Sequence, residues 1–558
     1  MQFKQTLVRL FLLLFPIAGF SQTTYLPQGD KGYILLERLE ILKRTDSTLN
    51  FSKTKPYSRA MMIGPVKHIA SLSSDPLKLS KTDRYNIQSY FMNNVEWVDS
   101  GMIMKSRKPL AKRFYQTPAN LYEVHIKDFD LVINPVLQFR IAKESDNSET
   151  LYQNTRGLTL RGRIANKIGF NAYLTENQEK DPIYVREWVD RRDAVPGAGF
   201  YKDFKTTGYD YFDARGYFTF NVTRYIDVAF GYDRNFIGNG YRSLMLADGA
   251  NSNLFLKLNT RIWKINYQNL FMDLHSAFVR GGDKLLPKKF AAIHHLDVAV
   301  TKWLNIGLFE AVIFGRKDRF DFGYLNPIIF YRSIEQQNGS FDNSIAGFDV
   351  KANFARKFQF YGQLTLDEFL LSEIKANNGW WANKWGIQLG GKYINAFNIS
   401  NLDLQVEHNR VRPFTYSHRD SVANYTHYNQ PLAHPLGANF SEWIGIARYQ
   451  PAPKWLIEAK LINYTQGRDS SFQNYGSNII LPNVTRVGDY GYSIGSGWKT
   501  NVTYASFLLS YELRENMFLE LQAIARKEEA VTAPLRSNNS TIINFGFRWN
   551  MHRREFDY

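Results

Sequence analysis

Cysteine is absent from the 558-residue chain, so a disulfide framework and a thiolate metal site are both excluded. Long apolar runs are also missing, because no stretch after Phe20 approaches the roughly 18 uncharged residues that a membrane helix needs. The sequence contains no P-loop, H-E-x-x-H or EF-hand pattern. The one Ser between glycines, Ser496, lacks the strand-to-helix context of a catalytic nucleophile. We therefore expect neither an enzyme nor a bound cofactor.

Aromatic and charged residues are both abundant. Phe, Tyr and Trp make up 15% of the chain, Asp, Glu, Lys and Arg make up 22%, and the formal net charge is +17. A chain that cannot form a core would not carry so many aromatic rings, so disorder is excluded. The length fits either two to four soluble domains or one large β-barrel.

Residues 1–21 are predicted to be a secretory signal peptide. Lys4 and Arg9 form a basic n-region, and residues 10–18 form an apolar segment too short to span a bilayer. Small residues at Gly19 and Ser21 suit cleavage after position 21. A buried N-terminal helix or strand is the alternative. We expect an exported chain, which is then either a secreted soluble protein or a membrane β-barrel.

Residues 22–130 are predicted to form a helical periplasmic region and a lead-in. Apolar residues recur on one helical face, namely Ile34, Leu35, Leu39 and Leu42. Ser80 followed by Asp83 resembles a helix-capping pattern. Three prolines, Pro56, Pro65 and Pro76, are predicted to break the region into short helices. Such a region could also receive a periplasmic or motility-machinery partner.

Residues 131–558 show a period of two instead. Apolar and polar residues alternate in the segments 263–268, 402–407, 455–461, 519–522 and 543–550. A soluble sandwich would show the same alternation. A membrane barrel is favoured because Trp and Tyr often bound the apolar positions, and because the last, aromatic-rich strand lies near the chain end.

Charges in the middle of these strands also favour a barrel. Glu458, Lys460 and Arg548 lie where a polar lumen would receive them. At roughly 20–27 residues per strand with its connection, the region holds about 16–20 strands, an even number in a bacterial barrel.

Histidine is unevenly distributed, since His408, His418, His427 and His434 lie close together in sequence. Their spacing matches no helical or ribbon metal site, so we expect hydrogen bonding in loops or in the lumen, and no metal.

The basic residues are spread along the chain, which together with export argues against nucleic-acid binding. An anionic outer-membrane surface is the expected partner instead: outer-membrane lipid or lipopolysaccharide, and acidic polysaccharide.

Four polar stretches are distinctive: 231–244 with 251–253, 322–327 leading to 349, 361–369, and 407–439. They combine Gly with Arg, Asp, Asn and Tyr, a composition typical of a networked lumen and suited to carbohydrate recognition. Within them the candidate polysaccharide-binding residues are Arg234, Arg242, Arg412, Tyr416, His418 and Tyr425.

At these stretches the sequence resembles the capsule-assembly Wzi family of outer-membrane proteins, in the Bacteroidota form whose relatives include RemB-like gliding-motility proteins. The resemblance covers most of the mature chain. It implies a barrel of about eighteen strands with a helical periplasmic bundle and a plugged lumen. The implied activity is lectin-like, holding capsular or exopolysaccharide at the cell surface.

We therefore predict an all-β, antiparallel outer-membrane β-barrel of about 16–18 strands, with a small N-terminal helical periplasmic subdomain. The leading functional hypothesis is binding and organisation of capsular or exopolysaccharide at the cell surface. Two alternatives are a surface component of gliding motility or adhesion, and an outer-membrane channel or transporter. A hydrolase is a fourth, for which the sequence offers no nucleophile or acid/base pair.

Overall fold

A computed structural model describes residues 23–72, 77–279, 284–327, 330–339, 342–470, 472–532 and 537–558. The predicted signal peptide, residues 1–21, lies outside these ranges. Three helices open the described chain: α2 (Gly32–Lys43), α3 (Arg59–Ala70) and α4 (Lys81–Met92). Among the described residues, no helix is long and apolar enough to cross a membrane.

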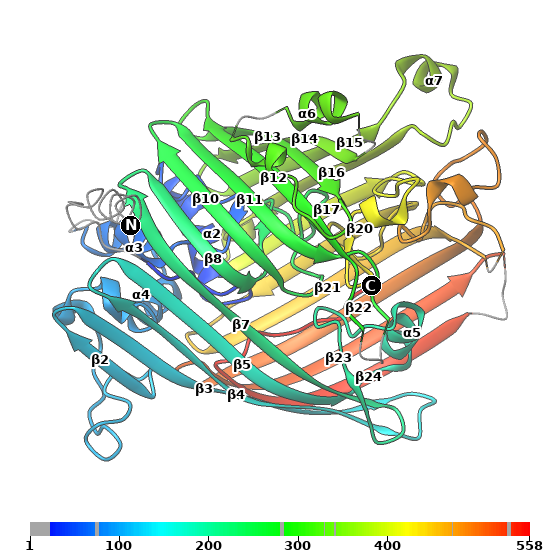
Figure 1. Cartoon of the computed structure of the whole chain (residues 1–558). Helices are drawn as coiled ribbons and strands as arrows, with labels where there is room; N and C mark the ends of the chain where they lie inside the picture. The colour runs from blue at the N-terminus through cyan, green and yellow to red at the C-terminus, as the bar shows by residue number, and fades with distance from the viewer. Residues whose placement is uncertain are drawn as a thin grey trace.

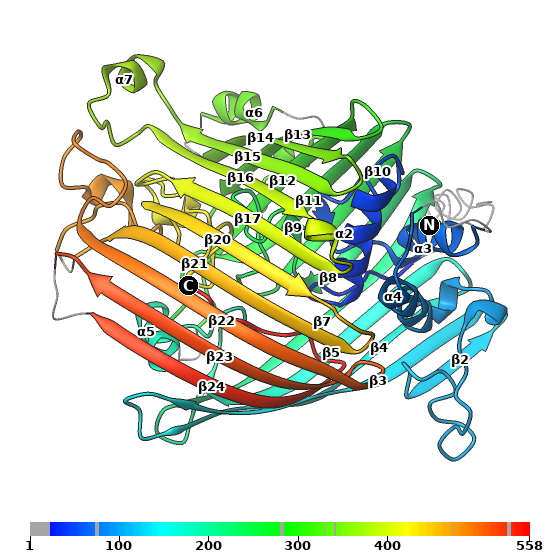
Figure 2. The same ribbon diagram turned by 180° about the vertical axis from the view of Figure 1, so that it is seen from behind.

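Eighteen antiparallel strands within the described ranges form a closed barrel, in agreement with the predicted architecture (Figures 1 and 2). Each strand pairs with the next along the chain, and β24 closes the ring on β3, with Trp549 opposite Leu137. The strands are β3 (Phe129–Glu144), β4 (Thr150–Ile164), β5 (Ile168–Lys180), β7 (Gly208–Thr223), β8 (Ile226–Asp233), β10 (Asn253–Ile262), β11 (Ile265–His275), β12 (Lys288–Ala299), β13 (Leu304–Phe314), β14 (Asn343–Phe354), β15 (Phe358–Glu368), β16 (Lys384–Tyr393), β17 (Leu402–Val411), β20 (Phe440–Tyr449), β21 (Trp455–Arg468), β22 (Trp498–Arg514), β23 (Met517–Ala530) and β24 (Asn538–Trp549).

Short elements complete the fold. Strand β2 (Tyr122–Ile126) pairs with β3, and β6 (Lys202–Phe204) pairs with β7. Two small ladders lie apart from the barrel sheet: β1 (Thr54–Lys55) with β9 (Phe236–Ile237), and β18 (Thr426–His427) with β19 (Gln430–Pro431). The loops carry α5 (Ile183–Arg192), α6 (Tyr331–Asn338) and α7 (Leu371–Ala376).

The strand sequence explains why the barrel faces lipid outside and encloses polar groups inside. Large apolar side chains are exposed on the outer wall, among them Phe139, Phe218, Phe230, Leu308, Phe360, Trp443, Phe507 and Phe545. The alternate positions are buried and polar, as in Gln138, Glu458, Lys460, Gln522 and Asn544. This is the pattern of a transmembrane barrel, because the outer wall must be apolar to meet acyl chains.

The two ends of the barrel differ sharply in loop length. Turns at one end are as short as Arg224–Tyr225 and Trp263–Lys264, whereas the other end carries the long connections 181–207, 412–439 and 469–497. Outer-membrane barrels place short turns in the periplasm and long loops outside the cell. The helices α2, α3 and α4 lie at the short-turn end (Figures 1 and 2), in agreement with the predicted small N-terminal helical subdomain.

Buried ion pairs attach the helices to the barrel. The Arg38 guanidinium in α2 lies 3.1 Å from Asp83 in α4 and also contacts Asp403 in β17. Lys31 Nζ lies 2.5 Å from both Glu512 and Glu515, where β22 turns toward β23. Because these pairs join elements distant in sequence, the helical region is a fixed part of the barrel end.

Local expectations were met at some positions and wrong at others. Ser80 and Asp83 form a capping box at the start of α4, as predicted. Pro65 lies inside α3 and does not end it, so the proposed break there is wrong. Trp263 and Lys264 form the turn between β10 and β11, so the strand predicted from residue 263 begins at Ile265. A two-residue turn can continue the apolar–polar alternation, which hid the boundary.

Replacing Phe507 with Arg tests the assignment of the lipid-facing wall. Phe507 lies near the middle of β22, and its side chain is 51% exposed outward. We expect Phe507→Arg to lower the free energy of unfolding in lipid vesicles by about 2–4 kcal/mol, because a charge at midplane depth is poorly solvated. Phe507→Leu is the control and should change it by less than about 1.5 kcal/mol. Equal stability of the Arg and Leu variants would contradict the assignment.

Replacing Arg38 with Met tests how the helices are held. The change leaves the buried carboxylates of Asp83 and Asp403 without their cation, at an expected cost of about 3–5 kcal/mol in unfolding free energy. Limited proteolysis should then cleave between α2 and α4 first. Lys67→Met is the matched control, since its partner Asp99 is exposed and the pair should contribute less than about 1 kcal/mol. Equal effects of the two substitutions would refute the role of Arg38.

Candidate functional site

The lumen is filled by three segments of the chain itself. The connection 234–252, the connection 412–439 and the C-terminal tail 550–558 fold into it. Two tyrosine hydroxyls join the first two segments: Tyr416 donates to the Leu244 carbonyl and Tyr425 to the Met245 carbonyl, both at 2.7 Å.

Ion pairs hold the tail in place along the inner wall. Lys460 of β21 contacts Glu555 and lies 2.9 Å from Asp557. Arg242 lies 2.9 Å from Asp557 on the other side. Burial alone would raise the pKa of Asp557, but the nearby Arg242 and Lys460 charges outweigh it and hold this pKa below its usual range. The carboxylate is thus an ionised bridge between the barrel wall and the connection 234–252.

Two arginines extend this ionic attachment down the tail. Arg553 lies 2.7 Å from Glu520 of β23, and Arg554 contacts Glu179 of β5. Because β5 and β23 lie on different parts of the wall, the tail crosses the lumen and is tied to both. One sequence signal points to this arrangement, a run of charged residues directly after an aromatic last strand.

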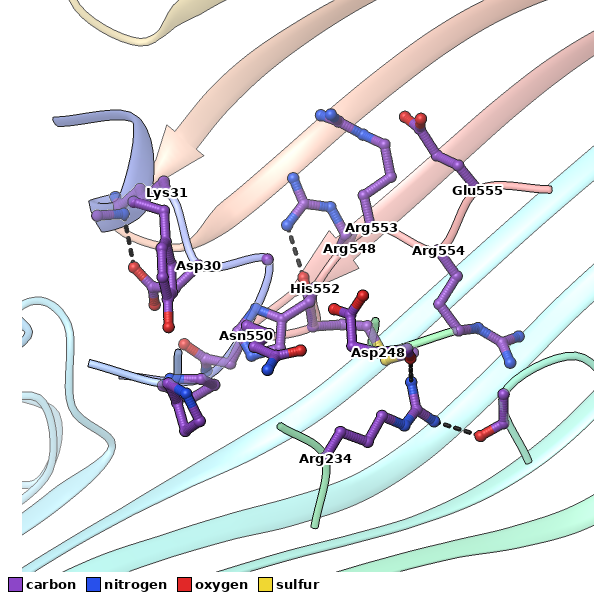
Figure 3. A pocket seen from close by; sticks show the side chains of 18 of the residues that line it. Asp30, Lys31, Arg234, Asp248, Arg548, Asn550, His552, Arg553, Arg554 and Glu555 are labelled. Carbon is purple, nitrogen blue, oxygen red and sulfur yellow. Dashed lines mark hydrogen bonds between the residues drawn. The ribbon is translucent and has the colours of Figure 1, made fainter. Parts of the chain in front are cut away.

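A chamber of about 650 Å³ remains beside the tail. Its lining includes Asn86 and Lys454 from the short-turn end and Trp188 and Gln430 from the long-loop side. This volume is in the range of small-molecule sites. Figure 3 shows Lys31 and Asp30 on one side, the tail residues on another, and Arg234 with Asp248 across from them.

Arg234 and Arg242, two of the predicted binding residues, both line this chamber. Arg234 donates to the carbonyls of Gly197 and Asp248, so its guanidinium contacts backbone oxygens. Arg242 bridges to Asp557 as described above. The chamber therefore brings these two predicted residues together.

The other predicted residues lie in the connection 412–439. Tyr416 and Tyr425 are fully buried, with their rings stacked at 5.7 Å. The His418 backbone N–H donates to Asn424, and burial lowers the pKa of the His418 imidazole. These three side chains shape the connection and offer no exposed face to a polymer.

Arg412 lies under an aromatic surface at the long-loop end that the sequence analysis missed. Its guanidinium donates to the carbonyls of Trp380 and Tyr492, at 3.1 and 3.4 Å. The segments that carry these residues pair through backbone bonds, as from Trp381 N to the Asp489 carbonyl at 2.9 Å. The guanidinium of Arg486 lies 4.1 Å from the Trp381 ring centre.

We call this surface the rim cluster; it consists of Trp380, Trp381, Arg412, Arg486, Tyr490 and Tyr492. Tyr490 is 57% exposed, and both tryptophans are half-buried. Its members come from three connections that meet only in the folded chain. Arg412 is the one member among the predicted binding residues, and the adjacent Trp380 and Trp381 are a sequence signal that could have pointed to the others.

Metal chemistry has no support in the described ranges, where no group of three His, Asp or Glu residues is placed to hold an ion. His427 and His434 are instead partners within hydrogen-bond networks. His434 lies 2.7 Å from Glu442, and His427 lies 3.1 Å from the Ser252 carbonyl.

The chain was compared with known proteins and structures. No protein-family model and no curated protein sequence matches it. Among solved structures it is similar to Wzi of Escherichia coli, at 12% identity and a TM-score of 0.57, covering 94% of this chain and 99% of that one. Wzi is an outer membrane protein involved in group 1 capsule assembly and a carbohydrate-binding β-barrel.

Two other matches are more distant. OprD of Pseudomonas aeruginosa has 11% identity and a TM-score of 0.43, covering 76% of this chain and 96% of that one. OccAB2 of Acinetobacter baumannii has 11% identity and a TM-score of 0.41, covering 75% and 98%.

A pH titration of the tail tests the burial of His552. Burial lowers the pKa of His552 to about 4, whereas an unfolded histidine titrates near about 6.5. Protonation therefore favours release: the stability of the tail is complete above about pH 6.5 and falls as the pH drops toward 4. Asp557, with its pKa below the usual range, stays ionised in this window.

We expect amide protection of residues 551–558 to fall between pH 7 and pH 5 in hydrogen-exchange experiments corrected for intrinsic rates. The variant His552→Gln should lose most of that pH dependence. An identical pH dependence in both proteins would contradict the prediction.

At 12% identity the likeness to Wzi establishes a shared fold: this chain is a closed, eighteen-stranded outer-membrane-type β-barrel with a helical short-turn end.

Proposed function

We propose that the protein binds an anionic capsular or exopolysaccharide outside the outer membrane and holds it at the cell surface. The observation that carries this proposal is the rim cluster, where aromatic rings and guanidinium groups share one surface at the long-loop end. The carbohydrate-binding activity of Wzi, which has the same fold, supports the same proposal.

The chemistry of the rim cluster fits a sugar polymer with acidic groups. Flat rings such as Tyr490 and Trp380 offer apolar faces to the C–H side of a pyranose. Arginine binds carboxylates through two parallel hydrogen bonds. Arg486 lies half-buried beside these rings and pairs with the exposed carboxylate of Asp489 at 2.6 Å, so an acidic sugar would take the place of Asp489 on this guanidinium. The rings of the rim cluster can contact the C–H face of an acidic sugar, and its cations can bind the carboxylate of that sugar.

The ion-paired tail also favours holding over transport. Eight charged side chains contribute to the attachments of the tail described above: Glu179, Arg242, Lys460, Glu520, Arg553, Arg554, Glu555 and Asp557. Moving the tail aside would separate buried charges, at a high cost in free energy. A fixed lumen provides a rigid support for external loops.

The predicted binding residues take different parts in this proposal. Arg412 belongs to the rim cluster itself. Tyr416, His418 and Tyr425 position the connection beneath it, and Arg234 with Arg242 would meet only a ligand that enters the chamber. Export through a signal peptide, and an origin among gliding bacteria, belong to the proposal as predictions.

A role in gliding motility or adhesion uses the same surface, since a polymer held there could serve either process. A channel is the competing function. The specific observation in its favour is the chamber, whose lining reaches from Lys454 at the short-turn end to Gln430 on the long-loop side.

Removing two rings of the rim cluster tests the proposal. We expect the double variant Trp380→Ala, Tyr490→Ala to bind the surface polymer of the source organism about 30-fold more weakly than wild type, equivalent to about 2 kcal/mol. Binding is measured by biolayer interferometry with purified protein. Tyr490 is exposed and Trp380 half-buried in a connection outside the barrel wall, so heat-modifiable gel mobility should stay unchanged.

Phe472→Ala is the matched control, because Phe472 is 97% exposed in a connection at the same end and lies outside the rim cluster. It should leave affinity unchanged. Equal affinity of wild type and the double variant would remove the rim cluster from the site, and absence of wild-type binding would overturn the proposed function.

A further inference from the structure

A basic hairpin projects from the short-turn end of the barrel. Residues 103–116 contain five Lys or Arg residues and no Asp or Glu: Lys105, Arg107, Lys108, Lys112 and Arg113. The prediction that basic residues are spread along the chain and not clustered is wrong for this segment. Backbone bonds define the hairpin, with Ser106 N donating to the Gln116 carbonyl at 2.8 Å and Leu110 pairing with Phe114.

All five cations are exposed, and none forms an ion pair with another described residue. Apolar side chains are exposed beside them: Met104 is 54% exposed, Leu110 63% and Phe114 37%. Unpaired cations beside exposed apolar side chains are typical of segments that lie in a membrane interface.

The hairpin is anchored at the level where the strands end. Tyr115 stacks on Trp549, the last residue of β24, with ring centres 6.1 Å apart. Phe114 packs near Tyr122 at the start of β2, at 6.0 Å. Figures 1 and 2 both show this segment extending below β2, away from the barrel wall.

The short turns between the strands lie at the same end of the barrel as the hairpin, and they also place cations beside aromatic rings. Arg224 lies over the ring of Tyr225 at 4.5 Å, and Lys264 lies 5.4 Å from the ring of Trp263. Two further turns place Lys302 beside Trp303 and Lys454 beside Trp455. Aromatic rings settle at the lipid headgroup level, and cations there attract anionic headgroups.

We propose that the hairpin 103–116 binds anionic phospholipid headgroups of the inner leaflet of the outer membrane. Its cations contact the phosphate groups, while Leu110 and Phe114 insert between the upper parts of the acyl chains. The turn residues with their rings continue this contact around the barrel. The hairpin thus fixes the height of the helical region against the membrane, independently of any ligand at the opposite end.

Charge and position together favour lipid as the occupant. Five exposed cations attract an anionic partner, and the adjacent exposed apolar residues favour one that also offers hydrocarbon. Phosphatidylglycerol meets both needs. A purely acidic protein surface would pair with the cations but leave Leu110 and Phe114 in water.

The test uses the full chain in nanodiscs of equal phosphatidylglycerol and phosphatidylcholine, extracted into mild detergent, with retained lipid counted by native mass spectrometry. Wild type should retain phosphatidylglycerol over phosphatidylcholine at 50 mM salt, and the preference should weaken at 500 mM. Replacing the five hairpin cations with Gln should lower the retained ratio at least about fivefold. Leu110→Ser with Phe114→Ser should lower total retained lipid while leaving the hairpin charges in place.

The matched control replaces five exposed cations at the long-loop end with Gln: Lys202, Lys205, Lys317, Arg319 and Lys375. It should keep the wild-type lipid ratio. Because the hairpin lies outside the barrel, heat-modifiable mobility should show that all variants are folded. An unchanged phosphatidylglycerol ratio in the five-Gln hairpin variant, or an equal loss in the control, would overturn the proposal.

Discussion

Closure of the strand ring is the constraint on which the rest of the structure depends. Lipid offers no hydrogen-bond partners, so every backbone group at membrane depth must pair within the protein. The pairing of β24 with β3 removes the last free edges and thereby fixes which face of each strand meets lipid. A ring of eighteen strands is wide enough to leave an aqueous channel, and here the chain fills it with its own connections and tail.

The polar lumen allows the chain to fill it with charged segments, which are held to the wall by ion pairs. Buried charges persist only in pairs, and the wall residues Glu179, Lys460 and Glu520 each meet a partner on the tail. The same principle attaches the helices through Arg38. The two ends of the barrel can then differ freely: the short-turn end carries cations and rings, and the long-loop end carries the rim cluster.

Much of the fold could be predicted because local sequence patterns determine it. Alternation around Glu458 and Lys460 identified both a strand and its lumen-facing side, and the Ser80–Asp83 box identified a helix start. The rim cluster could not be found this way, since Trp380, Arg412 and Tyr490 are brought together only by loop packing. Tyr416 and Tyr425 were predicted to bind ligand, but their hydroxyls donate to backbone carbonyls inside the lumen. A connection packed in this way contains the same residue types as a ligand-binding loop, so composition alone could not distinguish the two.

The central claim is that the tail and connections block the lumen of this barrel, and that the protein acts as a binding surface. Single-channel recording of the purified protein in planar bilayers tests that claim most directly. The account predicts no large, steady ionic current, because the tail and connections stay fixed by buried ion pairs. A large and stable current through the wild-type protein would contradict it and establish the chamber as a conducting path.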